Sequence, residues 1–159
     1  MVLDCFLVQH GEAKPEQEDP LRPLTEKGRD EVKKVAMCFS KLGIGVSSIY
    51  HSGKLRARQT AEILCEHIRP FRGVFEVEGL SPMDNPQRAS ELLKSANEPI
   101  VIVGHLPHLS RLVSLMVVGD ETKDIVKFRM GAVVCISRDE NIWRVSWILT
   151  PEIAGSCYR

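Results

Sequence analysis

The stretch Pro99–Val113, which reads PIVIVGHLPHLSRLV, joins a short apolar run to a helical pattern through a segment that contains two histidines. Proline suits the first position of a strand, so a buried strand is predicted over Ile100–Val103. A helix is predicted to begin near Pro107, with inward-facing residues at helical spacing: Leu109, Leu112, Val113 and Met116. A strand that leads directly into a helix is the repeating unit of an α/β protein.

The same alternation runs through the rest of the chain. Five further short apolar runs are predicted to be strands: Leu3–Val8, Val46–Tyr50, Val74–Val77, Ala132–Ser137 and Trp143–Leu149. The last two flank the polar turn RDEN (138–141), which favours a hairpin. Strands that alternate with helices predict an α/β fold, a three-layer sandwich with a mostly parallel central sheet.

Three more helical patterns lie between these runs. Thr25 is the predicted N-cap of the first, whose apolar stripe is Val32, Val35, Ala36, Phe39 and Leu42. The second stripe consists of Ala57, Thr60, Ala61, Leu64, Cys65 and Ile68. The third helix is predicted to have Asn85 as its N-cap and Pro86 at its first helical position, and to run through Leu93.

Length and composition describe an ordinary single domain, predicted over residues 1–159. The 21 basic residues balance 21 acidic ones, which leaves no net field to attract nucleic acid or an anionic membrane. Asp4 and Gln9 interrupt the one apolar N-terminal stretch, so neither a transmembrane span nor a signal peptide is expected, and the predicted location is cytoplasmic. Five cysteines without a CxxC pair predict reduced thiols, with Cys5 and Cys135 as small core residues.

Polar residues follow three of the predicted strands, at the edge where ligands bind in such sheets. His10 follows the first strand, and His105 follows the strand quoted above. His51 and Ser52 follow the second strand. Because the carboxyl ends of parallel strands meet at one edge, these histidines are expected to lie close together.

Two of these histidines and one arginine form a candidate phosphate site. His10 beside Gly11 suits a nucleophile, because glycine adds no bulk and lets backbone amides approach an anion. Arg56 lies in the first turn of the second helix, where a guanidinium and free helix N–H groups both suit a phosphate. His105 precedes a helix start and is expected to donate a further hydrogen bond. A single strand-end histidine is more often structural, so this hypothesis depends on the three residues lying together.

A metal site is the alternative for the second histidine, since His105 and His108 stand three residues apart. No carboxylate or cysteine has ligand spacing from them, and Pro107 disfavours a regular helix through His105. No metal is therefore expected. His108 is predicted to lie on the helix surface or at the pocket rim and His67 in solvent, whereas His51 either lines the cleft or packs.

Four motifs resemble those of one known family. In order they read VQHGEA, DPLRPLTEKGRDEV, SGKLRARQTAEIL and VIVGHLPHLSRL. Their order and spacing are similar to those of the histidine phosphatase superfamily, most of all to its small bacterial branch, the phosphohistidine phosphatases that act on histidine-containing phosphotransfer domains. The resemblance implies a phosphoglycerate-mutase-like α/β fold, a phosphorylated-histidine intermediate, and no metal or other cofactor. The expected partner is a phosphorylated protein or a small phosphorylated substrate, and the oligomeric state stays open.

The resemblance also implies roles for individual residues. His10 matches the histidine that attacks phosphorus, and Arg56 matches the second arginine that clamps the phosphate. His105 matches the second histidine of the pocket. Arg22, in the motif RPLT, matches an arginine that lies near the pocket in this branch.

Gln9 departs from the family pattern, which has Arg-His-Gly where this chain has Gln-His-Gly. The amide of Gln9 still donates a hydrogen bond, and Lys54 or Arg22 is expected to supply the absent charge. Loss of a charge-assisted hydrogen bond is expected to lower the rate by about one to two powers of ten. The alternative is a phosphate- or phosphoprotein-binding module with weak or no turnover.

Larger relatives also use an acidic proton donor after the third strand. Here the segment VEGLSPMDNP contains Glu78 and Asp84, which are both expected to be solvated loop acids. An imidazole leaving group needs less acid help than an alkoxide, so phosphohistidine is favoured over phosphate monoesters. Short connections leave no large insertion to cap the pocket, and an open cleft favours a protein substrate.

Overall fold

The computed structural model describes residues 1–157, in which six strands alternate with five helices. In chain order the elements are β1 (Val2–Gln9), α1 (Glu26–Ser40), β2 (Ser48–His51), α2 (Leu55–Ile68), β3 (Gly73–Glu76), α3 (Gln87–Ser95), β4 (Ile100–Gly104), α4 (His108–Val118), β5 (Val133–Asp139), β6 (Ile142–Leu149) and α5 (Pro151–Ser156).

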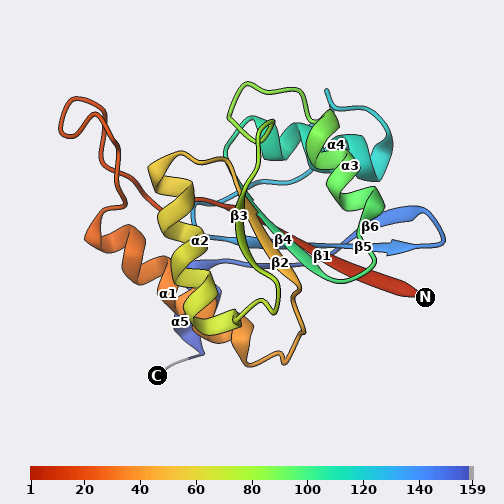
Figure 1. The fold of residues 1–159 in the computed structure, drawn as a ribbon, viewed down its shortest axis with the longest axis horizontal. Coiled ribbons are helices and arrows are strands. Elements are labelled where there is room, and N and C mark those ends of the chain that lie inside the picture. Colours follow the sequence, from red (N-terminus) through yellow and green to blue (C-terminus); the bar gives the residue numbers. More distant parts are fainter. Residues whose placement is uncertain (158–159) are drawn as a thin grey trace.

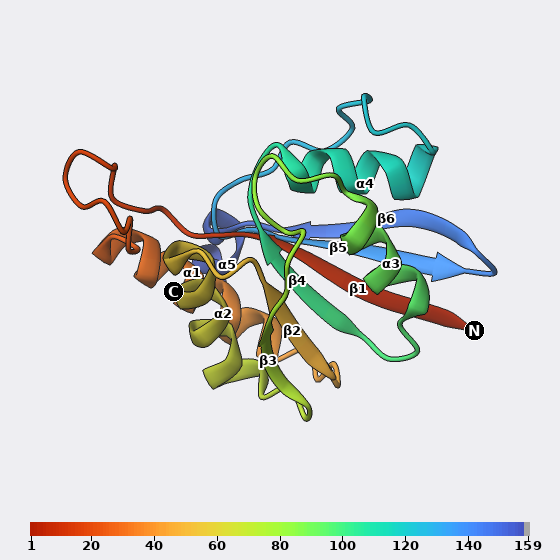
Figure 2. The same ribbon diagram turned by 45° about the horizontal axis from the view of Figure 1, so that its top comes forward.

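The strands form one sheet in the order β3-β2-β4-β1-β5-β6. β1, β2, β3 and β4 run parallel to one another, and β5 and β6 add an antiparallel hairpin at one side. Helices α1, α2 and α5 cover one face of the sheet, and α3 and α4 cover the other (Figures 1 and 2). This arrangement confirms the predicted α/β three-layer sandwich.

The alternation of side chains along the central strands explains the two cores. In β1, Phe6 and Val8 pack against α1 and α2, while Leu3, Cys5 and Leu7 point into the second core with α3 and α4. Since both faces of the strand are covered, its central residues 5–8 form a continuous apolar run instead of alternating with polar residues. Cys5 and Cys135 are both fully buried, as predicted for small core residues.

The first helix begins where the sequence predicts but ends earlier. The Thr25 side chain accepts a hydrogen bond from the Gly28 N–H, which confirms it as the N-cap. The helix ends at Ser40, however, so Leu42 lies outside it and is 53% exposed. The prediction that Leu42 belongs to the apolar stripe was therefore wrong.

The third helix begins one residue later than predicted. The Asn85 side chain accepts a hydrogen bond from the Gln87 N–H, so it closes a turn ahead of the helix. Pro86 is consequently the N-cap and not the first helical residue. The last helix, α5, was not predicted, although Thr150 caps it and Pro151 opens it. No helix within residues 1–157 has the length and hydropathy that a membrane span requires.

Candidate active site

His10 and His105 lie at the same edge of the sheet, because each follows the carboxyl end of a parallel strand. Gln9, the last residue of β1, pairs with Gly104, the last residue of β4, so the residues after them are neighbours. The ring centroids of His10 and His105 lie 5.0 Å apart at an angle of 51°. The expectation that the two histidines meet is confirmed.

The backbone decides which ring nitrogen of His10 is available. Its amide N–H donates to the Gly104 carbonyl at 3.0 Å, and its Nδ1 lies 2.7 Å from the Gly11 carbonyl oxygen. A carbonyl oxygen can only accept, so Nδ1 carries the proton and Nε2 keeps its lone pair. Burial lowers the pKa of His10 to about 4, and the positive charges of Arg56 and Arg22 act in the same direction. His10 is thus neutral near pH 7, with Nε2 free to attack an electrophile.

The structure corrects the role expected for Gly11. Its N–H donates to Thr60 Oγ1 at 3.0 Å and is therefore not available to an anion. A Cβ at this position would lie 2.7 Å from Val32 Cγ2 and 3.1 Å from the Gly28 carbonyl oxygen. Gly11 is needed so that the segment after β1, which carries His10, can pack against α1.

Arg56 lies in the first turn of α2 and is held by the same threonine. Thr60 Oγ1 donates to the Arg56 carbonyl at 2.8 Å, which links Arg56 to Gly11 through one buried hydroxyl. The Nε of Arg56 is buried without a hydrogen-bond partner among residues 1–157. Burial lowers the pKa of Arg56, and the charge of Arg22 adds to this effect.

Arg22 and Lys54 complete a group of three cations around the histidines. Arg22 is held in a left-handed conformation (φ 49°) and donates from Nε to the Lys14 carbonyl at 3.1 Å. The positive charge of Arg22 acts on His10 and that of Lys54 on His105, which places both cations near the pair of rings. Within the described chain, none of Arg22, Lys54 and Arg56 forms an ion pair. Three cations without a carboxylate partner favour an anion between them.

Ser52 contacts the site, although the sequence pattern placed it at this edge without giving it a role. Its Oγ lies 2.6 Å from Nε2 of His105, and it also accepts a hydrogen bond from the Lys54 N–H at 3.3 Å. Burial lowers the pKa of His105 to about 3, so this ring is neutral as well. The position of Ser52 directly after β2, at the sheet edge where His10 and His105 lie, could have indicated that it belongs to the site.

Gln9 lies at the end of β1 and is 8% exposed. Its carbonyl accepts a hydrogen bond from the Gly131 N–H at 2.9 Å, which ties the strand end to the start of the β5 region. Its side-chain Oε1 is buried and has no partner in the described part of the chain. A buried acceptor without a partner is costly, so Oε1 of Gln9 is an unsatisfied polar atom at this strand end.

Three other histidines have structural positions. His108 is fully buried, so its predicted place on the helix surface or pocket rim was wrong. The cause is that the 79–85 segment packs over the start of α4, as the backbone of Gly79 and Asn85 near the ring indicates. His51 is also buried and accepts a hydrogen bond on Nδ1 from the Gly53 N–H, while His67 is half-buried on α2.

The two loop acids after β3 differ. Glu78 is exposed, as expected of a solvated acid. Asp84 is half-buried, and its Oδ2 accepts a hydrogen bond from the Ser81 N–H at 2.9 Å. This carboxylate therefore stabilises its own turn, and the expectation of a fully solvated Asp84 was wrong.

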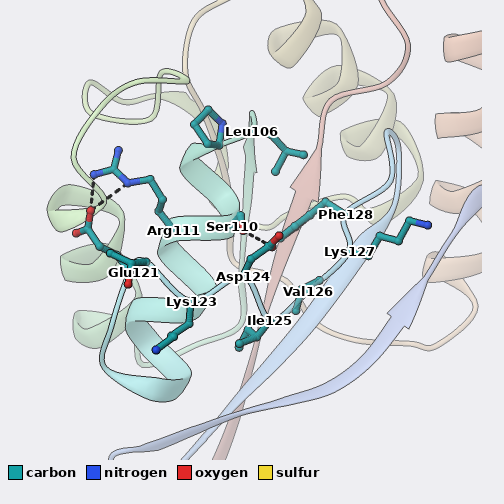
Figure 3. Close-up of a pocket in the computed structure, with 12 residues that line it drawn as sticks. Leu106, Ser110, Arg111, Glu121, Lys123, Asp124, Ile125, Val126, Lys127 and Phe128 are labelled. Carbon is teal, nitrogen blue, oxygen red and sulfur yellow. Dashed lines mark hydrogen bonds and ion pairs between the residues drawn. The ribbon is translucent and has the colours of Figure 1, made fainter.

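Two cavities lie near the catalytic edge. One of about 410 Å³ is lined by Lys54 and Arg56 together with Pro20, Leu21, Gly53, Leu55 and Arg58. A second, of about 920 Å³, lies between α4 and the 121–128 segment and begins at Leu106 and Pro107. Figure 3 shows the ion pair between Arg111 and Glu121 and the hydrogen bond from Ser110 to Asp124 that tie this segment to α4. Neither cavity is lined by His10 or His105, but the first contains Arg56 and Lys54 and is therefore the one that adjoins the candidate phosphate site.

Known proteins share parts of this sequence and its fold. The model of the histidine phosphatase superfamily (branch 1) matches residues 5–85. An uncharacterized protein of Picosynechococcus sp. is 34% identical over 125 residues, which are 74% of each chain. The phosphohistidine phosphatase SixA of Escherichia coli is 26% identical over 144 residues, 87% of this chain and 88% of that protein. A structure of the protein histidine phosphatase SixA complexed with tungstate superposes with a TM-score of 0.84 at 23% identity, over 94% of this chain and 97% of the other.

These matches confirm both the resemblance carried by the four motifs and the phosphoglycerate-mutase-like fold that it implied. The matched segment contains Gln9, His10, Arg22 and Arg56, and His105 lies beyond it. The chain belongs to the histidine phosphatase superfamily.

Proposed function

We propose that the protein is a phosphohistidine phosphatase that hydrolyses the phosphoryl group of a phosphorylated histidine in a protein. The observation that carries the proposal is a neutral His10 with a free Nε2, set among three cations that form no ion pair with a carboxylate of residues 1–157. Phosphoryl transfer depends mainly on positioning and on charge stabilisation, and this set of residues is suited to both. The similarity to SixA supports the same substrate class.

The reaction takes two steps. Nε2 of His10 attacks phosphorus in line, and the bond from phosphorus to the imidazole nitrogen of the substrate breaks as the new one forms. The leaving imidazole nitrogen takes the electron pair of that bond and a proton from water. Water then attacks phospho-His10, which releases inorganic phosphate and restores the free histidine. In both steps Arg56 and His105 hold the oxygens of the phosphoryl group.

Among the described residues, neither Asp84 nor Glu78 is arranged as a proton donor for the leaving group. This supports phosphohistidine over a phosphate monoester as the substrate. Asp84 is engaged by the Ser81 N–H, and Glu78 is exposed. A phosphate monoester would release an alkoxide, which needs a proton donor far more than an imidazole does. Access also supports a protein substrate, because the segment between β1 and α1 extends away from the sheet (Figure 2). We place this activity in the cytoplasm.

One experiment separates this proposal from its alternative. A phosphotransfer domain carrying [³²P]phosphohistidine is incubated with the wild-type protein and with His10→Ala. The wild type is expected to release inorganic phosphate and to show a transient acid-labile phosphoenzyme. His10→Ala is expected to show neither, with an unchanged far-UV circular dichroism spectrum, since no neighbouring group replaces the nucleophile. His67→Ala, on the same domain but away from the strand edge, is the matched control.

The alternative function is a phosphoprotein-binding module, which the replacement of the family arginine by Gln9 favours. In that case the wild type would bind the phosphorylated domain more tightly than the unphosphorylated one and release no phosphate. That outcome would overturn the phosphatase proposal.

A further inference from the structure

The hydroxyl of Ser52 lies within hydrogen-bond distance of His105, the second histidine of the site. Its Oγ lies 2.6 Å from Nε2 of His105, and the two residues are 53 positions apart in the chain. His105 is 1% exposed, so water does not compete for this contact. The other ring nitrogen, Nδ1, is buried and has no hydrogen-bond partner among residues 1–157.

Counting donors and acceptors identifies the tautomer. The ring is neutral, because burial holds the pKa of His105 near 3, so only one nitrogen carries a proton. If Nε2 carried it, Oγ of Ser52 would accept from both His105 and the Lys54 N–H. The hydroxyl proton and the Nδ1 lone pair would then both lack a partner within the described part of the chain.

The other tautomer leaves a single group unmatched. Ser52 donates its hydroxyl proton to Nε2 and accepts from the Lys54 N–H, which satisfies the hydroxyl fully. Only the Nδ1–H of His105 remains, and a donor is the group that a phosphoryl oxygen requires. The surrounding charges agree, since Arg56 and Lys54 both act on this ring and attract an anion to it.

We propose that Ser52 is a positioning residue: it holds His105 in the Nδ1–H tautomer and so presents that N–H to the oxygens of the transferring phosphoryl group. The proposal rests on the proposed function, because it assigns His105 to the phosphoryl oxygens. Without the hydroxyl, the ring is free to take the Nε2–H form. Its Nδ1 lone pair would then meet the anion, and the two would repel each other.

The tautomer can be measured directly in the free protein. Long-range ¹H–¹⁵N spectra of the histidine rings are recorded for the wild type, Ser52→Ala and Ser52→Thr, with His105→Gln to assign the signals. The wild type and Ser52→Thr are expected to show His105 as the Nδ1–H tautomer. Ser52→Ala is expected to show the Nε2–H form or an average of the two. An Nε2–H form in the wild type would overturn the proposal.

Vanadate binding and kcat provide a second test of the role of Ser52. Ser52→Ala is expected to weaken vanadate binding and to lower kcat for phosphohistidine by about threefold to tenfold, the effect of one neutral hydrogen bond. Ser52→Thr keeps the hydroxyl and is expected to restore both. Ser40→Ala, which removes a hydroxyl bonded to the Met37 carbonyl on α1, is the matched control and is expected to match the wild type. Thermal unfolding of each variant shows whether it is folded.

The failure of this proposal is distinguishable from that of the proposed function. If the wild type does not hydrolyse phosphohistidine, the phosphatase proposal fails, but the tautomer and vanadate measurements still decide the role of Ser52. If folded Ser52→Ala keeps the wild-type tautomer, vanadate affinity and kcat, Ser52 is only a structural residue and the proposal is wrong.

Discussion

Gln9 is the residue at which this chain departs from its family, and it lies at the end of β1 beside His10, the proposed nucleophile. Its neutral amide replaces a charged guanidinium, and Oε1 is buried without a partner among residues 1–157. Gln9→Arg is expected to tighten vanadate binding and to raise kcat for phosphohistidine by about one power of ten, because a charge-assisted hydrogen bond is the stronger one. Steady-state kinetics and vanadate titration measure the two effects.

The same variant tests whether another cation already supplies the charge of the missing family arginine. If Gln9→Arg leaves binding and rate unchanged or lowers them, Gln9 is not the limiting contact. Lys54→Met and Arg22→Met in the wild-type background then show which cation supplies the charge. Salt is expected to reduce the gain only slightly, because Gln9 is shielded from bulk ions.

Helix α1 packs closely against the segment after β1 that carries His10. A Cβ on Gly28 would lie 2.2 Å from the backbone oxygen of Glu12, which also accepts the Thr25 N–H. Helix propensity alone would favour alanine here by about 1 kcal/mol, but overpacking against backbone costs about 1–3 kcal/mol or more. Gly28→Ala is therefore expected to destabilise the protein and to lower activity by displacing His10. Urea unfolding and phosphatase assays measure both.

Gly45→Ala is the matched control for Gly28. No atom lies within 4 Å of a Cβ at position 45, and the position is not in the left-handed region. The substitution is expected to be neutral or to stabilise by up to about 1 kcal/mol, through a less flexible unfolded chain. Equal effects of the two substitutions would show that the contact of α1 with Glu12 is not close enough to exclude a methyl group.

The buried histidines determine how the whole molecule responds to acid. Burial is the main cause that lowers the pKa of four of them: His10, His51, His105 and His108. The unfolded chain takes up these protons near pH 6.5 and the folded chain only at lower pH. Stability is therefore complete above about pH 6.5 and falls as the pH falls toward 4. At pH 5, His10 and His105 alone remove about 4 kcal/mol, a large part of the roughly 5–15 kcal/mol that stabilises a domain.

Urea unfolding between pH 7.5 and 5 tests this expectation. Carboxylates titrate mainly below this window, so the histidines dominate the slope. His108→Leu is expected to make the pH dependence shallower by about one proton, since it removes one buried ring without touching the phosphate site. A free energy of unfolding that stays constant from pH 7.5 to 5 would contradict the neutral, buried state of these rings.

Much of the fold could be predicted from local pattern. The apolar runs, such as Val46–Tyr50 and Ile100–Val103, and the helical stripes between them predicted the strands and the helices that cover the sheet, because periodicity reports which faces are buried. The order of the strands in the sheet was not predicted. The rule that ligands bind at the carboxyl edge of parallel strands then predicted the meeting of His10 and His105. The errors at Leu42 and Pro86 are errors of helix ends, which sequence patterns locate only to within one or two residues.

The sequence by itself was enough to predict His10, Arg56 and His105 as the candidate catalytic residues, from their places in the strand and helix pattern. Only the tertiary structure decided how their hydrogen bonds are satisfied. The Gly11 N–H is used by Thr60, 49 residues away, and Nε2 of His105 by Ser52, 53 residues away. His108 became a core residue because a distant loop covers it. Local pattern encodes periodicity and caps, whereas burial and the partners of polar groups depend on which distant segments pack together.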